Sequence, residues 1–107
     1  MTPTEILIAA REKIERGWAQ GEYARAKNGN PIGYNAEKAV CWCSIGAIIA
    51  VDDDDPTDRA VYTLSDIVGR DITEWNDAPG RTQAEVLAAF DKAIEASKRT
   101  PEGKGQP

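Results

Sequence analysis

Cys41 and Cys43 are the strongest potential nucleophiles in this sequence. A cysteine becomes reactive when a nearby base or cation lowers the pKa of its thiol. Both cysteines lie in the apolar run 39–51, where burial would raise that pKa instead. On a helix, residues two apart point about 200° away from each other, which is unsuitable for a disulfide. The sequence favours packing roles for both thiols, with Cys43 as nucleophile kept as the enzymatic alternative.

Histidine is absent from the chain. Its absence excludes Ser/His and Cys/His nucleophile pairs, imidazole metal ligands and a histidine pH switch. Two cysteines alone cannot complete a four-ligand zinc site, and the glycines match no phosphate-binding loop or dinucleotide fingerprint. We therefore expect no catalytic residue, no metal and no cofactor.

The acidic run Asp52 to Asp55 has the ligand chemistry of a divalent-cation site. It lacks the spacing of a calcium-binding loop, because Thr57 and Thr63 stand at the sixth and twelfth positions, where glycine and glutamate are needed. A solvated loop is the better interpretation, with Asp54 or Asp55 stabilising the start of the next helix.

An aromatic ring, an amide, a carboxylate and a guanidinium gather ahead of a predicted helix, in Trp75, Asn76, Asp77 and Arg81. Arg81 and free helix amides could bind a small anion or a peptide carboxylate. A structural interpretation is at least as strong. Asn and Asp form turns, Trp75 would fill the core, and Arg81 could pair with Asp77.

The segment 23–34 predicts a β-hairpin around the turn Asn28-Gly29. A two-residue loop would place Tyr23 opposite Tyr34 and Arg25 opposite Ile32. We therefore add Tyr23, Arg25 and Tyr34 to the candidate binding residues.

Apolar spacing and capping residues predict the helices that position these groups. The first begins at the N-cap Thr2 and ends near Gly17; a third begins near Pro56, and residues 69–81 form a turn-rich connector before the last. The last runs from the capping box of Thr82 and Glu85 to about Ser97. The apolar stripes are Leu7, Ala10, Ile14 and Trp18 in the first helix, Val61, Leu64 and Val68 in the third, and Val86, Leu87, Phe90 and Ile94 in the last.

The run from Ala36 to Val51 predicts a helix that is apolar nearly all round, in which Ser44 is the one polar side chain after Ala39. A buried strand is the weaker alternative because the run is long. The predicted fold is mainly α, with about four helices around this central helix and a short β-hairpin between helices 1 and 2.

Composition favours one small acidic domain. The chain has 107 residues, with 18 acidic and 13 basic side chains and a net charge of −5. Residues 1–97 would form the domain and residues 98–107 a disordered tail. The net charge disfavours bulk binding to nucleic acid or anionic membranes, although Arg11, Arg25 and Lys27 could form a local basic patch. With no leader and no run long enough to span a bilayer, we expect a cytoplasmic protein without membrane contact.

Three segments together resemble a family of small proteins from bacteria and their phages. They are RGWAQG (residues 16–21), AVCWCSIGA (39–47) and WNDAPGRTQAEVL (75–87). The likeness covers about residues 5 to 97 and implies a mostly helical domain. It supplies no activity. The residues at motif positions are Trp18, Gln20, Arg25, Cys43, Trp75, Asn76, Asp77 and Arg81.

These observations favour a non-enzymatic binding or accessory module whose partner is an unknown protein or a small anionic ligand. Its candidate surface comprises Trp75, Asn76, Asp77, Arg81, Arg25, Tyr23 and Tyr34. One alternative is a small enzyme that uses Cys43 or carboxylates near Arg81. Another is a homo-oligomeric structural protein, such as a homodimer.

Overall fold

Five helices and one two-stranded antiparallel sheet make up the described residues, 1–52 and 55–99, of this computed structural model. This architecture confirms the predicted fold class, with one helix more than the sequence indicates. In chain order the elements are α1 (Pro3–Arg16), β1 (Ala24–Ala26), β2 (Ala39–Trp42), α2 (Ser44–Val51), α3 (Asp55–Val68), α4 (Ile72–Asp77) and α5 (Gln83–Arg99).

Helix α1 begins at the predicted N-cap Thr2, and helix α5 begins at the predicted capping box of Thr82 and Glu85. The Thr2 hydroxyl accepts a hydrogen bond from the Glu5 amide (3.1 Å), and the Glu5 carboxylate accepts one from the Thr2 amide (2.8 Å). Thr82 and Glu85 make the same reciprocal pair at the start of α5. Each box satisfies amides that the first helical turn leaves without partners. Local sequence therefore sets both boundaries.

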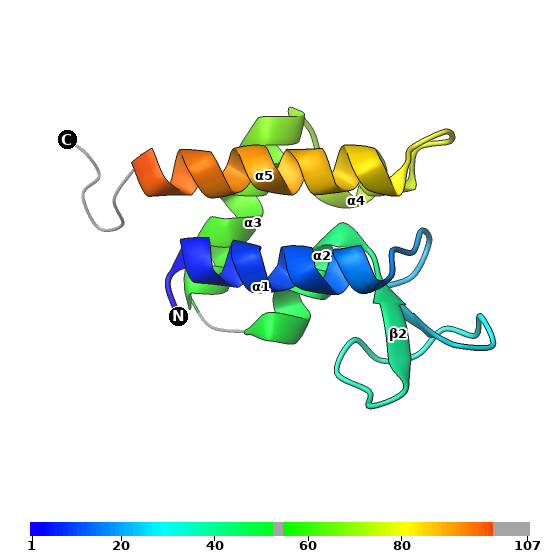
Figure 1. The fold of residues 1–107 in the computed structure, drawn as a ribbon. Helices are drawn as coiled ribbons and strands as arrows, with labels where there is room; N and C mark the ends of the chain where they lie inside the picture. Colours follow the sequence, from blue (N-terminus) through cyan, green and yellow to red (C-terminus); the bar gives the residue numbers. More distant parts are fainter. Residues whose placement is uncertain (53–54, 100–107) are drawn as a thin grey trace.

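Helices α1 and α5 lie side by side and antiparallel, with α3 crossing behind them (Figure 1). Arg11 binds Asp91 at 2.6 Å, and the Gln83 side-chain amide donates to the Ile14 carbonyl at 2.7 Å. Burial of a large apolar side chain contributes roughly 1.5–3 kcal/mol, so the core shared by these helices dominates the stability of the fold. Its largest fully buried apolar side chains are Ile6, Leu7, Ile14, Ile48, Leu64, Val86 and Phe90.

The apolar run predicted as one central helix contains two elements, so that prediction is wrong for its first half. Residues 39–42 form β2, in which Trp42 lies opposite Ala24 of β1. On its other edge, Trp42 donates to the Gly17 carbonyl (3.1 Å) and accepts from the Ala19 amide (3.0 Å). Backbone partners on both sides, far away in sequence, stabilise a strand here. The apolar helix is limited to α2.

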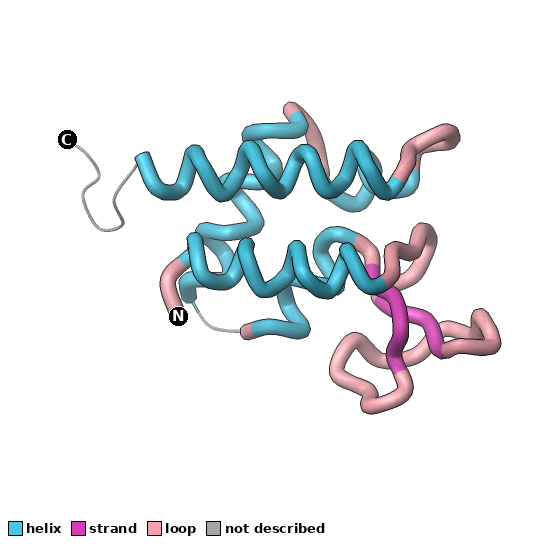
Figure 2. The backbone as a smooth tube through the Cα atoms, in the orientation of Figure 1, coloured by secondary structure: helices cyan, strands magenta, loops and turns pink. Residues whose placement is uncertain are grey.

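The residues on either side of the turn Asn28-Gly29 pair in a different register from the predicted one. The Ala26 amide donates to the Asn30 carbonyl (2.9 Å), which makes a three-residue loop and places Arg25 opposite Pro31 instead of Ile32. Gly29 adopts a left-handed φ of 89°, which is typical of three-residue loops. The main partner of β1 is β2, so the hairpin spans residues 23–42 and carries two long loops (Figure 2).

The connector predicted as a turn over residues 69–81 contains the short helix α4. Its N-cap Asp71 accepts a hydrogen bond from the Glu74 amide at 3.0 Å. Regular structure does stop at Pro79 and Gly80, as predicted. Helix α5 continues through Arg99, two residues beyond the predicted boundary at Ser97. Residues 100–107 of the predicted tail, like part of the Asp52 to Asp55 run, lie outside the described residues.

The hairpin packs on α2 at Gly46. A Cβ added there would overlap the carbonyl oxygen of Tyr23. We expect Gly46→Ala to lower the free energy of unfolding by about 2 kcal/mol, because this clash with backbone outweighs the roughly 1 kcal/mol that alanine gains in a helix. Urea unfolding measures the change.

Gly33→Ala is the matched control, because a Cβ at Gly33 meets no atom within 4 Å and its φ is not left-handed. We expect a change within about 0.5 kcal/mol. Equal destabilisation of both variants would contradict the close packing of the hairpin on α2.

Candidate functional site

The buried side chain of Asn76 is the centre of the predicted candidate site. Helix α4 carries Asn76 into the interior, where it is fully buried. Its Oδ1 accepts hydrogen bonds from Trp18 Nε1 (2.8 Å), the Ser44 amide (3.0 Å) and Ser44 Oγ (2.6 Å). Its Nδ2 donates to the Ala19 carbonyl (3.0 Å) and to Asp77 Oδ1 (2.9 Å). The amide therefore has no free donor or acceptor for a ligand.

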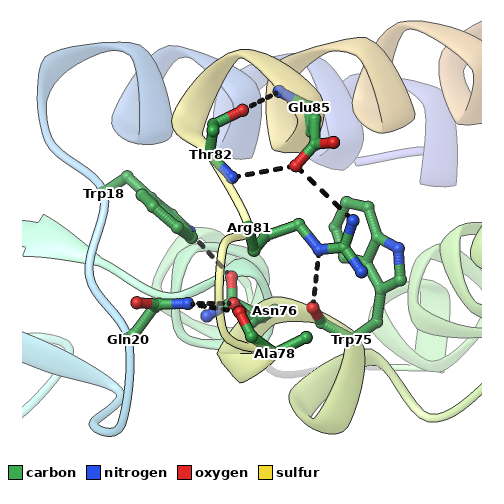
Figure 3. Close-up of polar contacts among 8 residues, drawn as sticks. All are labelled: Trp18, Gln20, Trp75, Asn76, Ala78, Arg81, Thr82 and Glu85. Atoms are coloured by element: carbon green, nitrogen blue, oxygen red, sulfur yellow. Dashed lines mark hydrogen bonds and ion pairs between the residues drawn. The ribbon is translucent and has the colours of Figure 1, made fainter.

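Gln20 and Asp77 attach the chain after α1 to the end of α4. The Gln20 side-chain amide donates to the carbonyls of Asn76 (3.0 Å) and Ala78 (3.1 Å), and the Gly21 amide donates to Asp77 Oδ1 (3.0 Å). Figure 3 shows Trp18 and Gln20 approaching Asn76 from the same segment. Carbonyls at the end of a helix lack intrahelical partners, so these bonds complete α4.

Arg81 covers the ring of Trp75 (Figure 3). Its guanidinium carbon lies 4.1 Å from the ring centroid, and its Nε donates to the Trp75 carbonyl at 2.8 Å. The Arg81 guanidinium forms an ion pair with Glu85 at 3.5 Å, four residues later in the chain. The predicted pairing of Arg81 with Asp77 is therefore replaced by a pairing with Glu85.

The Glu85 carboxylate also accepts from the Thr82 amide at the start of α5. The chain's own carboxylate therefore takes the place that an anionic ligand would occupy between Arg81 and the helix amides. This arrangement favours the structural interpretation of the segment 75–82.

The hairpin residues of the candidate site lie apart from Trp75 and Arg81 but are connected to α4 through Gln20. Arg25 donates to the carbonyls of Gly29 (3.0 Å) and Gln20 (3.1 Å), so it joins the β-turn to the segment that binds α4. Tyr23 and Tyr34 touch edge to face with ring centroids 6.1 Å apart. Tyr23 is exposed and Tyr34 is half-buried.

Cys43 is the N-cap of α2, and its sulfur accepts a hydrogen bond from the Gly46 amide at 3.3 Å. Burial raises the pKa of this thiol; the amides of Gly46 and Ile45 offset part of the rise, and Asp77 adds to it. Cys41 is half-buried in β2, and both cysteines are free. The prediction that both cysteines lie in one helix is wrong, because Cys41 belongs to β2 and Cys43 caps α2. The burial of Cys43 agrees with a packing role for its side chain.

Trp18, Gln20 and Ser44 complete the polar cluster, and reasoning from residue chemistry alone missed them as partners of Asn76. Trp18 was predicted in the apolar stripe of the first helix, but it lies beyond the end of α1 and forms a β-bridge with Trp42. Gln20 emerged only from the motif resemblance, whereas Ser44 had a signal of its own. A lone polar side chain in an apolar run needs a buried partner. Among the described residues, no group of three Cys, Asp or Glu side chains is placed to hold a metal ion.

Replacing the Asn76 amide by a carboxylate tests this cluster. In Asn76→Asp, an oxygen replaces Nδ2 and faces the Ala19 carbonyl and the Asp77 carboxylate. We expect the free energy of unfolding at pH 7 to fall by about 3 kcal/mol or more, because a buried charge is left without a partner. Because this environment raises the pKa of the new carboxyl, the loss should grow as pH rises.

Asn35→Asp makes the same chemical change at an exposed position. It should alter the stability by no more than about 0.5 kcal/mol. Urea titrations of both variants at pH 5 and pH 8 give the comparison. Similar behaviour of the two would contradict the assigned role of Asn76.

Alkylation of single-cysteine variants tests the state of the thiols. In Cys41→Ser, the remaining Cys43 should react with iodoacetamide at pH 8 roughly a hundredfold more slowly than in denaturant, because reaction requires local opening. In Cys43→Ser, the half-buried Cys41 should react with iodoacetamide faster in the native protein than Cys43 does in Cys41→Ser. Fast native labelling of Cys43 would support the enzymatic alternative.

Comparison with protein-family models gives a match over most of the chain. Residues 1–96 match the model of DUF6197, a family of unknown function. No curated protein and no solved structure matches the chain significantly. The match covers nearly all of the described fold, including α4 and the hairpin, and the chain belongs to the DUF6197 family.

Proposed function

We propose that this protein is a non-enzymatic binding module and that the hairpin, residues 23–42, is its contact surface. One observation carries the proposal: the hairpin projects from the helical body (Figure 2) and exposes two large apolar side chains, Tyr23 at 53% and Val40 at 45%. An exposed aromatic side chain is a typical anchor of a protein interface.

The anchoring of the hairpin supports a binding role. The Cys43 amide donates to the Tyr23 carbonyl (3.1 Å) beside the close contact at Gly46, and Arg25 fixes the β-turn. A surface that is already ordered loses little conformational entropy on binding, which favours affinity. The exposed side chains of the hairpin are thus presented on a preorganised backbone.

This proposal moves the contact surface away from the segment 75–82. The polar groups of Asn76 are fully used inside the fold, and Arg81 is held by Trp75 and Glu85. In the proposal, α4 positions the hairpin through Gln20 and does not itself form the contact surface. The partner that best fits the hairpin is a protein, because the hairpin exposes the aromatic ring of Tyr23 and the apolar side chain of Val40 among polar residues.

The raised pKa of Cys43 and the ion pair of Glu85 with Arg81 do not favour the enzymatic alternative. We propose the cytoplasm as the compartment, because two free cysteines are typical of a reducing environment. Within residues 1–52 and 55–99, no helix has the length and apolar character needed to span a bilayer.

A pull-down from host lysate tests the hairpin as a binding surface. The variant Tyr23→Ser, Val40→Ser removes both exposed apolar groups, and we expect it to bind the partner of the wild type at least tenfold more weakly, since aromatic anchors contribute about 2 kcal/mol or more. Mass spectrometry identifies the partner, and calorimetry with the purified partner measures the affinity.

Ile8→Ser is the control, because Ile8 is comparably exposed (41%) but lies on α1. It should bind as the wild type does. Circular dichroism and urea unfolding establish that all variants are folded. Unchanged affinity of the folded hairpin variant would refute the proposed surface.

A further inference from the structure

We infer that the hairpin docks on helix α3 of a second copy of this chain. This inference rests on the proposed function, since it names the occupant of the same surface. It follows from two exposed surfaces of opposite charge, each of which includes at least one exposed large hydrophobic side chain.

The hairpin is basic in an acidic protein. It carries Arg25, Lys27 and Lys38 against one acidic residue, Glu37, whereas the whole chain has a net charge of −5. Lys27 and Lys38 are exposed, and neither has an ionic partner within the described residues. Arg11, which the sequence allowed as part of a basic patch, is bound to Asp91 and Glu15 and adds no free charge. The hairpin therefore carries unpaired positive charge in addition to the exposed side chains of Tyr23 and Val40.

Helix α3 carries the complementary patch. Asp58, Tyr62 and Asp66 follow one another at intervals of four residues, which places them along one stripe of the helix. All three are exposed, and Tyr62, at 68%, is the most exposed of the large apolar side chains in the described residues. Arg59 is the one basic residue of α3, and it has an interaction within the chain. The stripe thus presents an aromatic ring between two carboxylates.

The two patches belong to different parts of one molecule. The hairpin extends beside the end of α1, whereas α3 packs mainly on α5 and α1 (Figure 1). A contact between hairpin and α3 of different copies joins unlike surfaces, so each copy can bind one neighbour through its hairpin and another through its α3. Reciprocal contacts between two copies build a two-fold dimer, whereas contacts that are not reciprocal build rings or open chains.

A second copy is the occupant that these charges favour. Opposite charges lower the energy of encounter and select the partner, while like charges across an interface reject it. The hairpin would meet acidic α3, and the exposed rings Tyr23 and Tyr62 would bury each other. Both patches occur in every molecule, so they are always present at equal concentration. Because each patch is small, the contact should be weak and dependent on concentration.

Sedimentation velocity of the full chain at roughly 10 µM to 1 mM protein tests the inference. We expect reversible self-association at low salt that weakens roughly tenfold or more as NaCl rises from about 20 mM to about 500 mM, because salt screens exposed charges. A wild type that stays monomeric over the whole range at low salt would overturn the inference.

Charge reversal then identifies the two surfaces. The hairpin variant Lys27→Glu, Lys38→Glu and the α3 variant Asp58→Lys, Asp66→Lys should each be monomeric, because each brings like charges together. An equimolar mixture of the two should associate again, since each variant then meets an oppositely charged partner surface. Lys92→Glu, Arg99→Glu makes the same change in net charge on α5 and should still associate.

A monomeric mixture, or equal loss of association in the α5 control and the hairpin variant, would overturn the inference. The proposed function fails separately. If the wild type is monomeric but captures a protein that the Tyr23→Ser, Val40→Ser variant loses, the hairpin remains a binding surface and only its occupant is wrong.

Discussion

The neutral amide of Asn76 is the interaction on which the rest of this structure depends. It accepts from Trp18 and Ser44 and donates to Ala19 and Asp77, so one side chain connects the segment after α1, the start of α2 and the end of α4. A buried polar group left without a partner costs about 1–3 kcal/mol. Three of the five bonds need an acceptor at this position and two need a donor. An aspartate lacks the donor and a hydrophobic residue lacks both, so neither can replace the amide.

The position of the hairpin follows from this cluster. The Gln20 side chain binds α4, and the Gln20 carbonyl accepts a hydrogen bond from Arg25. Gly17 allows the backbone of β2 to approach the end of α1, and Gly46 allows the backbone of Tyr23, just before β1, to approach the start of α2. These contacts fix the backbone of the hairpin, and therefore also the position of its exposed side chains, relative to the core. A surface anchored in this way resists reorientation, which is what a specific contact requires.

Local signals in the sequence predict α1, α3 and α5, because a helix with a cap and an apolar stripe depends mainly on its own residues. They do not predict β2 or α4. Strand β2 is apolar like α2, and the cap between them is Cys43, which lacks the signature of Ser or Asp. Only pairing with β1 and with the segment after α1 defines the strand. For α4, Asp71 and Glu74 form a capping signal in the sequence. The helix has only six residues and lies in a segment rich in turn-forming residues, so the signal does not stand out.

The sequence predicts which residues gather at the candidate site, but not that their polar groups bind one another inside the fold. Sequence reasoning selects Asn76, Asp77 and Arg81, yet it cannot see that Ser44, 32 residues before Asn76, takes up its oxygen. A group whose donors and acceptors are all satisfied inside the protein cannot bind a ligand unless the fold gives up those bonds. Binding must then rely on surface that folding leaves uncovered. In our proposal the hairpin supplies this surface, because Tyr23 and Val40 are exposed there.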